Sequence, residues 1–114
     1  MKKKDITGLV GSSKENMSIV TITVGEYVTY HYTCHSSVGY ESEFDLDNTN
    51  SIRLKKNDFQ YRHPARVKAG MCGADEAYGT YHFEAVEKGA TVIVFRRLFR
   101  GTIEREEYIT INVI

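Results

Sequence analysis

The sequence predicts an all-β fold, an immunoglobulin-like β-sandwich of about seven or eight strands. Three observations support this prediction. Apolar and polar residues alternate with a period of two in several short segments, as in strands with one face on a core. Turn residues separate these segments roughly every 8–12 residues. No segment has the apolar repeat of an amphipathic helix about three turns long.

The first half of the chain contains four predicted strands. Residues 18–33, SIVTITVGEYVTYHYT, alternate β-branched and aromatic side chains and are interrupted at Gly25-Glu26, which predicts two short strands joined at a tight turn or bulge. Residues 40–47 form a weaker third strand. Residues 51–64 contain a fourth, ended by Pro64 because proline cannot donate a ladder hydrogen bond.

The second half contains three more predicted strands, in residues 80–89, 90–97 and 104–114. Each alternates aliphatic or aromatic residues with polar ones. We expect them to form a meander in which Gly89 makes the turn between the first two.

Length and composition indicate one soluble domain. The chain has 114 residues, 41% of them hydrophobic and 26% charged, which is typical of a globular protein. We expect an N-terminal tail over residues 1–17, flexible in part, and the folded domain over residues 18–114.

The balance of charge makes some partners improbable. Fifteen Lys and Arg residues balance fifteen Asp and Glu residues, so no overall field attracts nucleic acid or an anionic membrane. We expect neither partner, no cofactor, and a monomer when the chain is free. The basic start has no apolar segment behind it, so it does not resemble a signal peptide; we expect the cytoplasm or an intracellular vesicle, and export stays open.

Three loops should gather at one end of such a sandwich: residues 34–40, 69–80 and 96–101. The third, RRLFRG, is unusual because Leu98 and Phe99 lie among arginines, where a turn is normally polar. We place both at the loop tip. Two interpretations stay open: Phe99 is an interface anchor, or it folds back to cap the sandwich while the arginines form a solvated rim.

These features resemble the chagasin family, proteinaceous inhibitors of papain-like cysteine peptidases with an immunoglobulin-like fold. The resemblance runs from about Ser18 to the C-terminus. TITVGEYVTYHY is similar to the family's opening strand pair, and HSSVGY takes the place of its Asn-Pro-Thr-Thr-Gly-aromatic loop. YGTYHF is similar to its Gly-Gly-Thr-x-His-Phe stretch, and RLF lies where the family has Arg-Pro-Trp.

The resemblance implies an inhibitor rather than an enzyme, which reversibly occludes the peptidase cleft with three loops. Gly39 would supply a permissive backbone, and Tyr40 would anchor the first loop. Arg97 and Phe99 would contact the far wall of the cleft. The implied peptidase-binding residues are His35, Ser36, Ser37, Val38, Gly39, Tyr40, Gly70, Met71, Cys72, Gly73, Ala77, Tyr78, Gly79, Thr80, Arg97, Leu98, Phe99 and Arg100.

The chain departs from the family pattern in all three loops. Residues 35–38 lack the family's proline and its threonines, and Leu98 replaces a second proline, so ordering these loops costs more on binding. Phe99 in place of Trp should be a weaker anchor. In the long second loop, either GMCG (70–73) or AYG (77–79) is the part that contacts the peptidase.

The cysteine and histidine residues allow other kinds of site. Cys34 and Cys72 lie at the loop end, where either a disulfide or two free thiols are possible. His31, Cys34 and His35 suggest a Cys-His nucleophile or a zinc site, but their spacing matches no standard motif. The remaining alternative is an immunoglobulin-like binding or adhesion module with a non-peptidase partner, because the fold does not determine the function.

Overall fold

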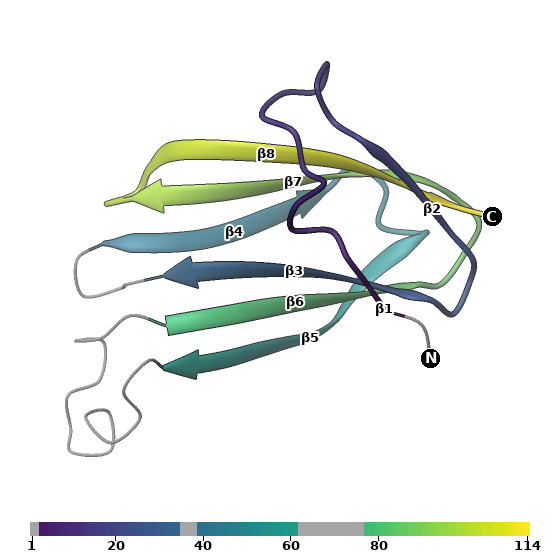
Figure 1. Cartoon of the computed structure of the whole chain (residues 1–114), viewed down its shortest axis with the longest axis horizontal. Coiled ribbons are helices and arrows are strands. Elements are labelled where there is room, and N and C mark those ends of the chain that lie inside the picture. Colours follow the sequence, from purple (N-terminus) through teal and green to yellow (C-terminus); the bar gives the residue numbers. More distant parts are fainter. Residues whose placement is uncertain (1–2, 35–38, 62–76) are drawn as a thin grey trace.

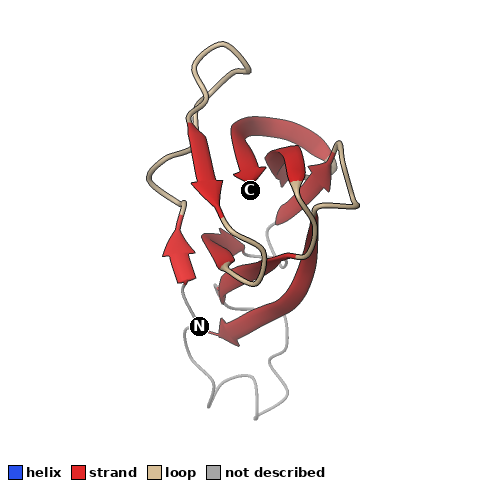
Figure 2. Ribbon diagram, turned by 90° about the vertical axis from the view of Figure 1, so that its right-hand side faces the viewer, coloured by secondary structure: helices blue, strands red, loops and turns tan. Residues whose placement is uncertain are grey.

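The computed structural model describes residues 3–34, 39–61 and 77–114 of the chain. Every regular element in these residues is a β-strand, as Figure 2 shows, and none of them belongs to a helix able to span a bilayer. The strands are β1 (Lys3–Asp5), β2 (Ile19–Ile22), β3 (Tyr27–Cys34), β4 (Tyr40–Leu46), β5 (Ile52–Tyr61), β6 (Ala77–Ala85), β7 (Gly89–Phe99) and β8 (Thr102–Val113).

The strands form two four-stranded sheets that enclose one core (Figure 1). Sheet A has the order β1-β3-β6-β5, and sheet B has the order β2-β8-β7-β4. This matches the A-B-E-D and G-F-C orders of immunoglobulin-like sandwiches. The alternation in the sequence is reproduced in the burial, since every second residue of β6 is buried. The predicted fold class is therefore confirmed.

The predicted meander is wrong at its first turn. β6 belongs to sheet A and β7 to sheet B, so residues 86–88 cross between the sheets, and Gly89 is the first residue of β7. β2 and β3 also join different sheets, although the predicted tight turn at Gly25 is present, with φ of 94°. Strand periodicity does not reveal these crossings, because a hairpin and a crossing both preserve the alternation.

The segment that we expected to be an N-terminal tail contributes to both sheets. β1 pairs in parallel with β3, and Ile6 is fully buried in the core. Gly11 pairs with Tyr108 of β8 through two backbone hydrogen bonds of 2.8 and 2.7 Å. The folded domain therefore begins near Lys3 rather than at residue 18.

Aromatic rings join the two sheets in the core. Tyr30 of sheet A stacks on Phe95 of sheet B, with ring centroids 3.7 Å apart and planes within 4°. Phe44 of sheet B meets Tyr81 of sheet A edge to face at 4.9 Å. Such pairs contribute roughly 0.5–1.5 kcal/mol each beyond the area they bury, so they set the separation of the sheets.

Gly79 lies in the middle of the aromatic layer of sheet A. The ring of Tyr32 crosses over Gly79 and donates a hydrogen bond of 2.7 Å from its hydroxyl to Asn57 Oδ1 on β5. A Cβ at position 79 would overlap this ring. A glycine is therefore needed here for internal packing.

We predict that Gly79→Ala destabilises the fold by roughly 1–3 kcal/mol, the usual cost of overpacking a core. The displaced Tyr32 ring would also lose its hydrogen bond to Asn57. Urea unfolding measures the change. Gly8→Ala is the matched control, because no atom lies within 4 Å of its added Cβ; equal stability of the two variants would contradict this account of Gly79.

Candidate functional site

The three predicted loop segments leave the sandwich at the same end. In sheet A, Cys34 and Tyr61 both pair with Ala77, so β3 and β5 end where β6 begins. In sheet B, Tyr40 and Thr102 both pair with Phe99, so β4 and β8 begin where β7 ends. The C-terminus lies at the opposite end (Figure 1). The predicted gathering of the loop attachments is confirmed.

Two of these segments are hydrogen-bonded to each other. The amide of Arg100 donates to the carbonyl of Gly39 at 2.8 Å. Gly39 has φ of 93°, and a Cβ on it would lie 2.7 Å from Arg100 Cγ. Both the conformation and the close approach therefore favour glycine at position 39, and the end of the first segment is held against the β7–β8 hairpin.

Leu98 and Phe99 are strand residues, and their predicted place at a loop tip is wrong. Both lie in β7, where Leu98 pairs with Ile103 and Phe99 with Thr102. The turn consists only of Arg100 and Gly101, with φ of 52° and 82°. Positive φ at both central residues is the requirement of a type I′ hairpin, whose twist matches that of the strands. The register of the β7–β8 ladder shifts between Arg97 and Leu98, and pairing then continues to the turn.

A stack of four side chains covers this end of sheet B. The rings of Tyr40 and Phe99 lie 4.7 Å apart, with Arg97 Cζ 4.7 Å from the centre of Tyr40 and Arg100 Cζ 5.2 Å from the centre of Phe99. We call Arg97, Tyr40, Phe99 and Arg100 the arginine–aromatic stack. Phe99 is half-buried by its neighbours and Arg100 is exposed, so the stack packs on the sandwich and also faces outward.

The predicted residues of the second segment divide between the two faces of β6. Ala77 is buried, and Gly79 lies beneath Tyr32. Tyr78 is 46% exposed, and Thr80 Oγ1 lies 2.9 Å from His31 Nδ1 on the outer face of sheet A. Within AYG, Tyr78 is therefore the residue that offers a large side chain to a partner.

The other predicted binding residues lie outside the described residues: His35, Ser36, Ser37, Val38, Gly70, Met71, Cys72 and Gly73. A disulfide between Cys34 and Cys72 stays a prediction for the same reason. Within residues 3–34, 39–61 and 77–114, no group of three or more His, Cys, Asp or Glu side chains is arranged to hold a metal ion.

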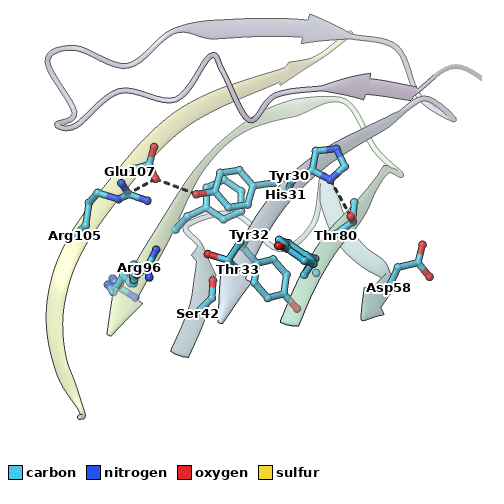
Figure 3. A pocket seen from close by; sticks show the side chains of 14 residues that line it. Tyr30, His31, Tyr32, Thr33, Ser42, Asp58, Thr80, Arg96, Arg105 and Glu107 are labelled. Carbon is cyan, nitrogen blue, oxygen red and sulfur yellow. Dashed lines mark hydrogen bonds and ion pairs between the residues drawn. The ribbon is translucent and has the colours of Figure 1, made fainter. Parts of the chain in front are cut away.

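A cavity of about 700 Å³ opens at this end and is lined by residues of both sheets. Figure 3 shows Tyr30, Arg105 and Glu107 meeting in it. Tyr30 donates from its hydroxyl to Glu107 Oε1 at 3.0 Å, and Arg105 Nε lies 3.3 Å from the same oxygen. Burial, and next the nearby Glu107 carboxylate, raise the pKa of the Tyr30 phenol well above its ordinary value.

Sequence reasoning missed these cavity residues, although the pattern contains a signal for them. Ile109, Ile111 and Val113 of β8 are buried, and counting back by two places Glu107 and Arg105 on the same face. Along β8, the inward-facing residues therefore change from apolar to charged at the place where the core ends and the cavity begins.

Comparison with known proteins was made by sequence and by structure. No protein-family profile matches the sequence, and no curated protein is similar to it. The structure is similar to that of the cysteine protease inhibitor EhICP2 from Entamoeba histolytica, with a TM-score of 0.68 and 14% identity over 99% of this chain and 95% of the other. It is also similar to amebosin, with a TM-score of 0.62 and 15% identity over 99% and 97% of the two chains.

The chain shares the fold of these two proteins. Both alignments cover nearly the whole length of the two chains compared. The immunoglobulin-like sandwich implied by the family resemblance is thereby supported by solved structures.

We predict that Arg100→Asn stabilises the fold by roughly 0.5–1 kcal/mol. Arg100 has φ of 52°, a conformation that costs most side chains energy, whereas Asn before Gly is preferred in a type I′ turn. Urea unfolding of the variant measures the gain. Arg53→Asn in β5 is the control and should give no gain, because asparagine is disfavoured in strands; equal gains in both would contradict the turn assignment.

We predict that Tyr30 makes the fold less stable at alkaline pH. Its pKa is raised above the ordinary value of 10.0 in the folded state, so the unfolded chain loses this proton first, and stability falls as the pH rises above about 10. Tyr30→Phe should reduce the slope of unfolding free energy against pH by up to about 1.4 kcal/mol per pH unit. An unchanged slope in Tyr30→Phe would contradict the prediction.

Proposed function

We propose that this chain is a reversible, tight-binding protein inhibitor of papain-like cysteine peptidases, which occludes the active-site cleft with the loop end of its sandwich. The observation that carries the proposal is the full-length likeness to the cysteine protease inhibitor EhICP2. The order of the loop motifs along the sequence, and their attachment at one end of the sandwich, support it independently.

To block the peptidase cleft, the inhibitor needs a surface that is ordered before binding, and it needs no reactive groups. The hydrogen bond from the Arg100 amide to the Gly39 carbonyl connects the first segment to the β7–β8 hairpin. Because the segment and the hairpin are already joined, less conformational entropy is lost when both contact the peptidase. In this proposal residues 35–39 enter the cleft beside the catalytic cysteine of the peptidase, and the hairpin contacts one wall. No residue of the inhibitor takes part in covalent chemistry.

The arginine–aromatic stack is the proposed anchor on that wall. Aromatic and arginine side chains dominate the binding energy of many interfaces, because they bury a large area at a small entropic cost. Phe99 is already held by Tyr40 and Arg100, so little ordering remains. The unfavourable φ of Arg100 is consistent with a functional constraint, since strained residues concentrate at binding sites.

Leu98 and Ile103 lie at the same end of sheet B, on the face opposite to the arginine–aromatic stack. They pair across β7 and β8 directly before the turn, and Ile103 is 50% exposed. Leu98 is half-buried, so Ile103 is the exposed member of this apolar pair; exposed apolar residues near aromatic ones are typical of interface surfaces. In the proposed complex Leu98 contributes from the strand, with Ile103 as an additional contact that sequence reasoning did not include.

The decisive experiment is a titration of the purified protein into papain, with a fluorogenic peptide as substrate. The proposal predicts loss of activity that is complete at one equivalent and returns on dilution. Activity that is unaffected by micromolar protein, with papain and with several related peptidases, would contradict it. An immunoglobulin-like binding module with a non-peptidase partner would then be the better interpretation.

We predict that Phe99→Ala weakens inhibition at least tenfold, because truncating an interface anchor costs about 2 kcal/mol or more. Tyr108→Ala is the matched control, since Tyr108 is also a half-buried aromatic of sheet B and lies away from the loop end. Melting temperatures verify that both variants are folded. Equal inhibition by the two variants would exclude the stack as the anchor.

The same assay tests Arg100 directly. Arg100→Asn removes the guanidinium over Phe99 while relieving the strained turn. We predict a weaker inhibitor with a more stable fold, a combination that a purely structural role for Arg100 cannot produce.

A further inference from the structure

A row of polar side chains crosses the inner face of sheet B directly beyond the aromatic core. By register, Ser42 of β4 lies beside Arg97 of β7, and Arg97 lies beside Arg105 of β8. The inner face of a sandwich normally carries apolar residues. Two arginines directly opposite each other on one face also repel, so this row costs stability and calls for an explanation other than packing.

The two arginines are incompletely compensated. Arg105 Nε lies 3.3 Å from Glu107 Oε1, an oxygen that also accepts the hydroxyl of Tyr30. Arg97 Nε is 3.9 Å from Glu104 Oε1, too far for a hydrogen bond. Within the described part of the chain, this buried Nε has no hydrogen-bond partner. Buried polar groups without partners are rare and often mark a functional site.

The other charged groups around the cavity are paired outside this row. Arg96 contacts three carboxylates, those of Glu43, Asp45 and Glu106. Asp58 is paired with Lys56 at 3.0 Å and His82 at 2.8 Å, while His31 lies 3.5 Å from Asp5. The remaining row therefore has two guanidinium groups: Arg105 has a carboxylate oxygen at 3.3 Å, whereas the carboxylate paired with Arg97 lies 3.9 Å from its Nε, beyond hydrogen-bond distance.

The walls beside this row are aromatic. Tyr30, Tyr32 and Phe95 line the cavity of about 700 Å³ together with Ser42, Arg97 and Arg105. Figure 3 shows the side chains of Tyr30 and Arg105 directed into the same space. The rest of the lining is largely polar and includes His31, Thr33, Asp58, Thr80, Arg96 and Glu107. A cavity of this size accommodates a small organic molecule, and ligand sites combine aromatic surface with polar groups that fix the orientation of the ligand.

We propose that this cavity binds a small organic monocarboxylate, with its charged group at Arg97, Arg105 and Ser42 and its apolar body against the tyrosine and phenylalanine rings. The planar guanidinium fork matches a carboxylate in geometry. A single guanidinium without a hydrogen-bonded carboxylate, that of Arg97, suits a monoanion better than a dianion. Ser42 Oγ accepts from the Tyr81 hydroxyl at 3.4 Å, which leaves the proton of Ser42 to donate to a bound oxygen. This proposal does not rest on the proposed inhibition, although Arg97 belongs to both surfaces.

The test is a titration of the ¹⁵N-labelled protein with sodium benzoate, followed by NMR at constant ionic strength. Binding predicts saturable shifts of the amides of Ser42, Arg97 and Arg105. Benzamide has the same shape without the charge and should cause no saturable shift. Arg97→Gln and Arg105→Gln should each weaken benzoate binding at least tenfold.

Arg53→Gln is the matched control variant. Arg53 lies on β5, where it pairs with Glu84 away from the cavity, and its loss should leave benzoate binding unchanged. Three outcomes would overturn the proposal: no saturable shift with benzoate, equal binding of benzamide, or equal binding of inorganic phosphate. The comparison of benzoate with benzamide uses the wild-type chain, so it does not depend on the folding of any variant.

Discussion

The stack of Tyr30 on Phe95 is the contact on which the rest of this sandwich depends. It joins the central part of β3 to that of β7, with the rings nearly parallel and 3.7 Å apart, and so sets the separation of the two sheets. On one side of it the inner faces are apolar and carry buried residues such as Val28 and Val113. On the other side polar residues enter the inner face of sheet B, where Glu107 accepts the hydrogen bond that the hydroxyl of Tyr30 donates. The boundary between core and cavity thus passes through a single amphipathic side chain.

Beyond this boundary the chain uses backbone geometry to keep the loop end ordered. The hairpin between β7 and β8 has the shortest connection compatible with the twist of the strands, and the Gly39 carbonyl accepts a hydrogen bond from the Arg100 amide at its tip. Ring stacking and cation–π contacts then hold Tyr40 and Phe99 together. A surface built in this way can bind with little reorganisation, which fits the proposed wedge-like inhibitor better than a site that closes around its ligand.

Arg97 belongs to two arrangements at once. Its guanidinium packs on Tyr40 in the arginine–aromatic stack, and its register position beside Arg105 places it in the polar row of the cavity. The family resemblance accounts for the first arrangement only. The neighbour of like charge, Arg105 on β8, lies beside Arg97 because the two strands pair. No local sequence motif indicates this pairing. A ligand held by this row would therefore lie directly behind the surface proposed to face a peptidase.

The sequence by itself determined the fold class, most of the strands, and the end of the sandwich at which the loops gather, because the alternation of side chains and the order of turn residues are local properties. It also identified Gly39, Phe99 and Arg100 as residues of that end. Only the tertiary structure decided that β6 and β7 lie in different sheets, that Leu98 and Phe99 lie in a strand, that Gly79 makes room for Tyr32, and that the N-terminal segment belongs to the core. These features depend on which strands become neighbours, and pairings between residues far apart in the chain leave no mark on either segment alone.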